Sequence, residues 1–436
     1  MPTATSSADS RHDSLRRAVE SRRDELVSLA RDLVRFPTVN PPGDAYTPCC
    51  EYILNWCAAR RYEARLIRAH GTPGDSDRHP RTNVVARREG RGPGPTVHFN
   101  GHIDVVEVGP GWTKPPFDGV VSDGRVYGRG TCDMKGGLAS AMIAADAFAE
   151  VQPDFDGAIE ISGTVDEESG GFGGVAHLAR QGFFSKPRVD HVVIPEPLDK
   201  DRICLGHRGV WWAEIETRGV QAHGSMPFMG DCAVRHMGAV LSAFERDLFP
   251  ALDRKETTMP VVPEGARRST LNINALHGGE PELEGYDGLP SPNVPHRARM
   301  VIDRRFLLEE DIGDVKREVT DILDRLARER DGFAYAIRDV MEVLPTMTEA
   351  DAPVVRAVEA AIRDVFGREA EHVISPGTYD QKHIARIGHM HDCIAYGPGR
   401  LELAHMADEY VGIDDMVESA TVMALTIDTL LNGPAS

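Results

Sequence analysis

The stretch TVHFNGHIDVV, from Thr96 to Val106, is an apolar run that ends in a His-x-Asp pair. β-Branched and aromatic residues in such a run are typical of a buried strand, which presents ligands at its carboxyl end. Two other apolar runs end in acids: ISGTVDEESGG (Ile161 to Gly171) and VVIPEP (Val192 to Pro197). A further acid lies in the glycine-rich turn GRGTCDMKGG (Gly128 to Gly137), which opens a helix. Buried strands and one tight turn are therefore predicted to deliver metal-type ligands.

The sequence between these motifs alternates between helical and extended patterns. Apolar residues recur at helical spacing from Leu15 to Val34, and Met134 to Glu150 is a helical stretch rich in Ala and Met. Short apolar strands that alternate with helices indicate an α/β fold, with a mostly parallel sheet and helices on both faces. After Leu205 the strands alternate polar and apolar residues and accompany two helices, which indicates a smaller α+β insert.

The chain has 436 residues, more than one average domain, so we expect two domains. Residues 1–13 are polar and are predicted to form a disordered tail. The insert is predicted over residues 208–343. Residues 14–207 and 344–436 are predicted to form one metal-binding catalytic domain, because the candidate ligands flank the insert.

Composition narrows the class of protein. A formal net charge of −19 argues against nucleic acid and anionic membrane surfaces as partners. The seven cysteines are odd in number and have no repeated spacing, which indicates a reducing compartment rather than a disulfide framework. No run approaches the roughly 18 apolar residues of a membrane span. The sequence predicts a cytoplasmic protein.

The candidate ligands favour a two-metal hydrolase. Mixed histidine and carboxylate ligands suit zinc, cobalt or manganese, and two such ions about 3.5–4 Å apart can clamp a hydrolytic water. Asp104 lies two residues after His102 on an extended segment, so it faces the same way and can hold His102 in place. The candidates are His102, Asp104, Asp133, Glu167, Glu168, Glu196 and His405.

In this order the motifs resemble the M20 metallopeptidases, a family that holds acetylornithine deacetylase, succinyl-diaminopimelate desuccinylase, aminoacylase and glutamate carboxypeptidase. The shared elements are His-x-Asp, Gly-Arg-Gly-x-x-Asp-Met-Lys-Gly-Gly, Asp-Glu-Glu-Ser-Gly-Gly, Glu-Pro and Ala-His-x-x-x-Glu-Tyr. The match extends from about Leu26 to Leu431. The resemblance implies two divalent metal ions, with Asp133 as the carboxylate that bridges them. It also implies that Glu167 is the general base and that the metal ligands are His102, Asp133, Glu168, Glu196 and His405.

The resemblance assigns roles to the insert as well. It is similar to a lid domain that forms a homodimer or higher homo-oligomer, and His223, in GVQAHGSMP, would stabilise the oxyanion in the partner's active site. Asn293 and Arg305 resemble substrate-binding elements, and Arg305 would pair with a substrate carboxylate. Thr378, in SPGTYDQKH, resembles a loop that lines the substrate pocket.

These features predict hydrolysis of an amide-type C–N bond in a small substrate that carries a carboxylate, with deacylation of an N-acyl amino acid as the leading reaction. Desuccinylases carry consecutive arginines where this chain has His207-Arg208, which favours an acetylornithine deacetylase-like activity over removal of a succinyl group. The alternatives are a dipeptidase or carboxypeptidase, an aminohydrolase that releases ammonia, and a binding protein without activity. The sequence assigns no role to Cys132.

Overall fold

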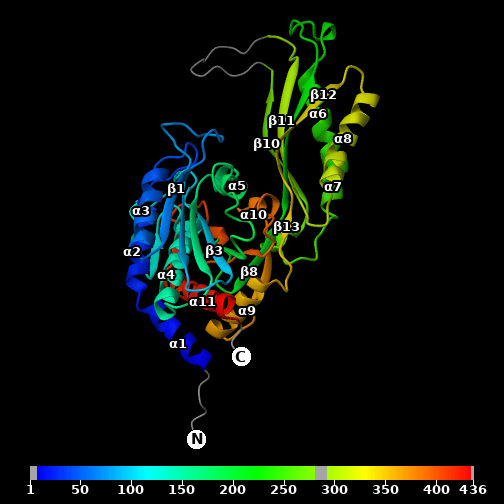
Figure 1. Ribbon diagram of the computed structural model, residues 1–436. Coiled ribbons are helices and arrows are strands. Elements are labelled where there is room, and N and C mark those ends of the chain that lie inside the picture. Colours follow the sequence, from blue (N-terminus) through cyan, green and yellow to red (C-terminus); the bar gives the residue numbers. More distant parts are fainter. Residues whose placement is uncertain (1–6, 280–291, 434–436) are drawn as a thin grey trace. The chain divides into compact units, whose positions relative to one another are not determined.

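The computed structural model describes residues 7–279 and 292–433 (Figure 1). These residues form two compact units. The first extends to Gly206 and also contains Met347–Val373 and the chain from Tyr379 onward. The second contains His207–Thr346 and the short segment Ile374–Thr378.

The first unit is built around a nine-stranded sheet in the order β1-β2-β6-β3-β7-β15-β8-β13, with β14 paired to β8. Strands β6 (Ala158–Thr164), β3 (Thr96–His102), β7 (His191–Ile194) and β15 (Cys393–Ala395) are parallel at its centre. Strand β1 (Glu63–Arg68) is an antiparallel edge strand. The other strands of the sheet are β2 (Thr82–Glu89), β8 (Arg202–His207), β13 (Thr346–Met347) and β14 (Glu371–Ser375), and a separate small sheet contains β4 (Val120–Ser122), β5 (Arg125–Tyr127) and β16 (Tyr410–Gly412).

Strands β3 and β6 are buried on both faces, but the two faces differ in chemistry. Because side chains alternate along a strand, Val97, Phe99 and Gly101 share one face of β3. Gly101 leaves room there for Leu138 of helix α4 (Gly136–Val151). Apart from Ala158, the opposite face carries only polar side chains from these strands: Thr96, His98, Asn100 and His102 from β3, and Glu160, Ser162 and Thr164 from β6.

Helices cover both faces of this sheet. Phe184 stacks on His98 at the polar face, where Asp380 at the start of α10 (Gln381–Arg386) also binds Asn100. The predicted α/β class, with a mostly parallel central sheet and an α+β insert, is confirmed. The remaining helices of the first unit are α1 (Ser7–Glu20), α2 (Arg23–Val34), α3 (Tyr46–Ala58), α5 (Val175–Arg180), α9 (Pro353–Phe366) and α11 (Ile413–Asn432).

Two predicted boundaries differ from the structure. The predicted tail over residues 1–13 is helical from Ser7, and Arg11 donates to the buried carboxylate of Asp428, which fixes α1 to α11. The predicted catalytic segment 344–436 loses Ile374–Thr378 to the second unit. Ile374–Thr378 belongs to the second unit because of backbone pairing: the backbone N–H of Arg208 donates to the carbonyl of Ser375.

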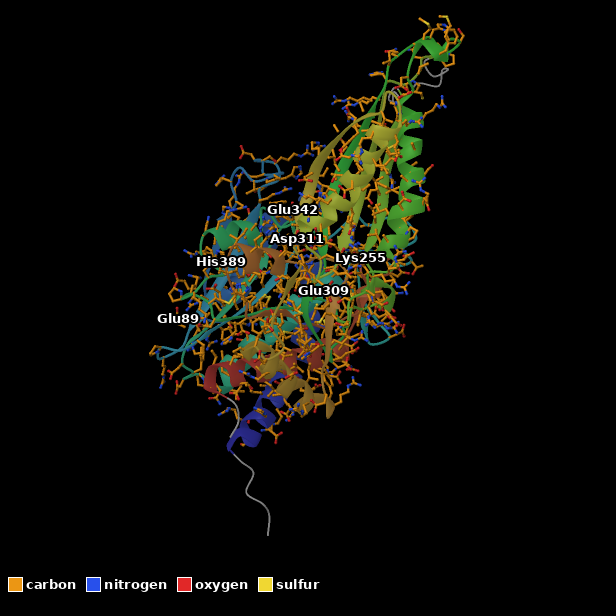
Figure 2. All side chains as sticks on the ribbon, turned by 90° about the vertical axis from the view of Figure 1, so that its right-hand side faces the viewer. Glu89, Lys255, Glu309, Asp311, Glu342 and His389 are labelled. Carbon is orange, nitrogen blue, oxygen red and sulfur yellow. The ribbon has the colours of Figure 1, made fainter. Side chains whose placement is uncertain are left out.

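The second unit has a four-stranded antiparallel sheet in the order β10-β11-β9-β12. Helices pack on one face of it around a core that includes Trp211, Met300 and Leu323 (Figure 1). Asp311, labelled in Figure 2, caps the longest helix of this unit: its side chain accepts the backbone N–H groups of Gly313 and Asp314. The elements are β9 (Gly209–Arg218), α6 (Ala233–Ala243), α7 (Phe249–Leu252), β10 (Thr270–Gly278), β11 (Arg297–Phe306), α8 (Ile312–Glu329) and β12 (Ala334–Val343). Within the described ranges, no helix is long and apolar enough to cross a membrane.

Candidate metal centre

Five predicted ligands meet at the carboxyl ends of the central strands. The Nε2 atom of His102 lies 3.0 Å from Oδ1 of Asp133 and 3.9 Å from Oε1 of Glu196. The Nε2 atom of His405 lies 3.6 Å from Oδ2 of Asp133 and 3.2 Å from Oε1 of Glu168. One ligand atom each from His102, Asp133 and Glu168 lies within 4.8 Å of the other two. Asp133 is thus placed between the two histidines, with one oxygen toward each.

The loop that carries Asp133 is held by a buried acid, Glu409. Its Oε1 atom accepts the backbone N–H groups of Gly130, Cys132 and Asp133 at 3.0, 2.9 and 3.1 Å. Its Oε2 atom accepts from Arg129 at 2.6 Å. Four hydrogen bonds to one carboxylate leave the loop little freedom, so they fix the direction of the Asp133 side chain.

Asp104 acts on the acidic turn as well as on His102. The Nδ1 atom of His102 lies 2.9 Å from the backbone oxygen of Asp104, which orients the imidazole ring. The Asp104 carboxylate accepts the backbone N–H groups of Glu167 and Glu168 at 3.2 and 3.1 Å, and the side-chain amide of Asn40 at 2.9 Å. Asp104 therefore joins the His102 strand to the turn that carries the two glutamates.

Glu167 and Glu168 diverge although they are neighbours. Strand β6 ends at Thr164, and Glu167–Ser169 is a 3-10 turn. Glu168 lies against His405, whereas Oε1 of Glu167 accepts from Nζ of Lys382 at 2.6 Å. The turn thus directs Glu168 into the ligand cluster and leaves Glu167 beside the cluster, where it binds Lys382.

The cluster is short of positive charge. Burial raises the pKa of Glu168 to about 7, and the charge of Asp133 adds to this shift. Burial also raises the pKa of Glu196 well above its usual range, again with the charge of Asp133. The hydrogen bond to Glu168 raises the pKa of His405 to about 9. These shifts arise because several negative charges are buried close together. A divalent cation would compensate these charges, so the residues fit metal ions by charge as well as by donor type.

The residues predicted to bind substrate lie in the second unit. His223 and Asn293 form an isolated β-bridge, so the structure brings these two together. Arg305 lies in β11, where its guanidinium donates to Asp303 at 2.7 and 3.0 Å. Thr378 is in the segment that clusters with this unit, not with the metal ligands.

The comparisons with known proteins agree with this geometry. The model of peptidase family M20/M25/M40 matches residues 98–429. The chain belongs to this family. The expected M20 resemblance is therefore confirmed, and this M20 chain is a hydrolase of amide or peptide bonds, as predicted.

Curated relatives of this M20 chain extend over almost its whole length. It is 31% identical over 413 residues to succinyl-diaminopimelate desuccinylase of Pseudoalteromonas atlantica, covering 93% of this chain and 99% of the relative. It is 29% identical to the enzyme of the same name from Marinobacter nauticus, covering 89% of this chain and 94% of the relative. Among solved structures, human carnosine dipeptidase 1 has a TM-score of 0.72 at 19% identity, covering 97% of this chain and 99% of that one. This last likeness concerns the fold.

Sequence reasoning missed four residues around the site. Glu409 lay inside a quoted motif, but only its hydrogen bonds show that it holds the Asp133 loop. Asn40 follows a Thr-Val segment with no visible motif. Asp380 and Lys382 lie in the stretch after Thr378, and the two charges so close together were the signal that could have found them.

Proposed function

We propose that this M20 hydrolase removes the acyl group from an N-acyl amino acid, a small substrate with a free carboxylate. The observation that carries the proposal is the convergence of two histidines on opposite oxygens of Asp133. The proposed metal ligands are His102, Asp133, Glu168, Glu196 and His405, and two zinc ions suit them, with cobalt or manganese as alternatives. When bound, such ions polarise a carbonyl and lower the pKa of water.

Glu167 is the proposed general base. It takes a proton from the attacking water, whose oxygen forms the new bond to the acyl carbon, and delivers that proton to the nitrogen as the C–N bond breaks. Lys382 supports this role because its ammonium group binds one oxygen of Glu167 and leaves the other for the proton. Asp104 supports it by holding the turn through two backbone N–H groups.

The substrate contacts are assigned to the second unit. Arg305 is proposed for the substrate carboxylate, with Asp303 orienting its guanidinium group by two hydrogen bonds. Asn293 and Thr378 are proposed to line the pocket. These assignments are supported by the fact that Arg305, Asn293 and Thr378 all belong to the second unit. Asn293 also forms a β-bridge with His223 there.

We assign His223 to the active site of a partner subunit in a homodimer. The loop that follows it exposes apolar surface, since Phe228 and Met229 are 79% and 66% exposed. Apolar side chains at that exposure are suited to burial against a second copy of the chain. The test mixes inactive Glu167→Gln chains with inactive His223→Ala chains under conditions of subunit exchange.

The mixing experiment has two clear outcomes. If each site draws His223 from the other chain, the mixed dimer has one site with both lesions and one intact site, so activity returns. If His223 acts within its own chain, both sites carry a lesion and the mixture stays inactive. Inactivity despite demonstrated exchange of subunits rejects the shared site.

The acyl group is proposed to be small. The guanidinium of Arg208 donates through Nε to the backbone carbonyl of Pro376 and through Nη1 to those of Ala266 and Arg268, so most of its N–H donors are already used within the second unit. That use favours acetyl over succinyl, in contrast to the names of the curated relatives. Metal-loaded enzyme should therefore release amine faster from N-acetyl than from N-succinyl amino acids. A preference for N-succinyl substrates would reject the small-acyl proposal but keep the reaction class.

Two other substrates belong in the same screen. Release of free amino acids from dipeptides, but not from N-acyl amino acids, would favour a dipeptidase. Release of ammonia alone would favour an aminohydrolase. We also propose a cytoplasmic location, since no disulfide joins the cysteines of the described part of the chain.

A further inference from the structure

A cavity of about 370 Å³ lies beside the edge strand β1. This volume is within the range of small-molecule sites, about 300–1,000 Å³. The lining combines two cations with apolar side chains and one amide, and its residues are Arg65, Leu66, Ile67, Gln181, Phe183 and Arg188. None of these residues has a role in the proposed hydrolysis.

Two guanidinium groups share one aromatic ring in this cavity. The guanidinium carbon of Arg65 lies 5.0 Å from the ring centroid of Phe183, and that of Arg188 lies 4.6 Å from the same centroid. Arg188 is neutralised by the buried Glu160. Across the ranges 7–279 and 292–433, Arg65 has no carboxylate partner, although the chain carries a net charge of −19. One uncompensated guanidinium over an apolar floor suits an anion with an apolar arm.

We propose that this cavity binds a small organic anion, a carboxylate or a phosphate ester, and that its occupancy is transmitted to the active site. Arg65 holds the anionic group through its N–H fork. Leu66, Ile67 and Phe183 contact the apolar arm. Arg188 is the residue through which the cavity reaches the interior of the first unit.

The first half of the connection is a buried cluster at the amino ends of β3 and β6. Arg188 binds both oxygens of Glu160, which is fully buried. Oε1 of Glu160 lies 3.1 Å from Nδ1 of His98. The other ring nitrogen of His98 lies 2.7 Å from Oγ of Ser162. An anion that draws Arg188 away therefore removes a cation from a buried carboxylate.

The second half ends at the proposed base. Ser162 donates to Oδ1 of Asn100 at 2.7 Å, and Nδ2 of Asn100 donates to Asp380 at 2.9 Å. Lys382, two residues after Asp380, donates to Glu167. Hydrogen-bonded side chains on the polar face of two strands thus join the cavity to the residue that positions Glu167. Loss of order along this path lowers kcat rather than substrate binding.

Binding is tested by calorimetry on metal-loaded enzyme, with benzoate and phenyl phosphate as probes and benzamide as the neutral control. We expect both anions to bind, and Arg65→Gln to weaken that binding by about tenfold or more. Arg65→Lys should retain part of it. The matched control is Arg328→Gln, which changes an exposed arginine on α8 that does not line the cavity, and it should bind as the wild type does. Equal affinity of wild type and Arg65→Gln for both anions overturns the site.

Transmission is tested by steady-state kinetics with whichever substrate the enzyme turns over. The kinetic experiment therefore rests on the proposed function, whereas the calorimetry does not. Benzoate can also occupy the metal centre, where it would raise KM. We expect a second effect, a fall in kcat of severalfold at saturating benzoate, that is absent in Arg65→Gln and present in Arg328→Gln. Inhibition that is purely competitive, or that Arg65→Gln leaves unchanged, overturns the transmission.

Discussion

Two buried clusters of histidine and carboxylate lie on the same face of β3 and β6, and they differ in charge balance. At the amino ends, His98 and Arg188 surround one acid, Glu160. Burial would raise the pKa of Glu160, but the adjacent imidazole of His98 and the guanidinium of Arg188 outweigh it and lower that pKa to about 2. At the carboxyl ends the acids outnumber the cations, and burial raises the pKa of Glu168 to about 7.

The charges of the Glu160 cluster are balanced by its own side chains, whereas the cluster around Asp133 needs an added cation. Glu160 is satisfied by side chains of its own fold, so it requires nothing further. Among the described residues, the ion pairs of Asp133, Glu168 and Glu196 are with His102 and His405, and none joins these three carboxylates to an arginine or lysine. Histidine next to acid is therefore an ambiguous motif until the charges around it are counted.

The largest expected effect comes from exchanging one histidine in each cluster. His102→Gln should lose bound metal and about 10³-fold or more of the activity, because the metal contributes several kcal/mol to the reaction. His98→Gln should keep the metal stoichiometry of the wild type. Metal analysis and kcat/KM measure both variants, and loss of metal from His98→Gln would remove the distinction between the clusters.

Glu167→Gln should come next in size. The variant cannot accept a proton, so we expect kcat to fall by about 10²–10⁴-fold while metal content is kept. Glu329→Gln is the matched control, since it makes the same change at an exposed glutamate on α8, outside both clusters. A Glu167→Gln enzyme with near-normal kcat would show that another group is the base.

A smaller loss is expected at Lys382. Lys382→Gln removes the ammonium group that holds Glu167, so we expect kcat to fall by about 10–100-fold with little change in KM. Lys382→Arg keeps the charge and should restore part of the rate. Equal loss in both variants would indicate that the lysine serves packing and not the position of Glu167.

The smallest expected effect concerns acid stability. The pKa of Glu160 is about 2 in the folded chain, below the ordinary glutamate value of 4.5, so its contribution is present above pH 4.5 and is lost as the pH falls through about 2. This shift corresponds to about 3 kcal/mol of unfolding free energy. Denaturant unfolding of metal-free protein between pH 5 and about 2 should show wild type losing that much more than Glu160→Gln. Parallel curves would contradict the low pKa.

Much of the fold and of the candidate site follows from local patterns. The strands β3, β6 and β7 were recognisable because each is a short apolar run that ends in a ligand-type residue. The contact of Asp104 with the Glu167 turn and the role of Glu409 were not, since both depend on backbone N–H groups far away in the sequence. The same holds for α1, which begins at Ser7 and contacts Asp428 through Arg11.

The sequence by itself determined the family, the strand endings and the set of acids and histidines, because these depend on side-chain type and on the period of two along a strand. Only the tertiary structure decided which histidine belongs to which charge cluster. His98 and His102 have the same parity on one strand, so the strand period does not separate them, and only the His-x-Asp pair marked His102 as a candidate ligand. They differ in what other segments bring to them: Arg188 and Glu160 to the first, and Asp133 and Glu196 to the second.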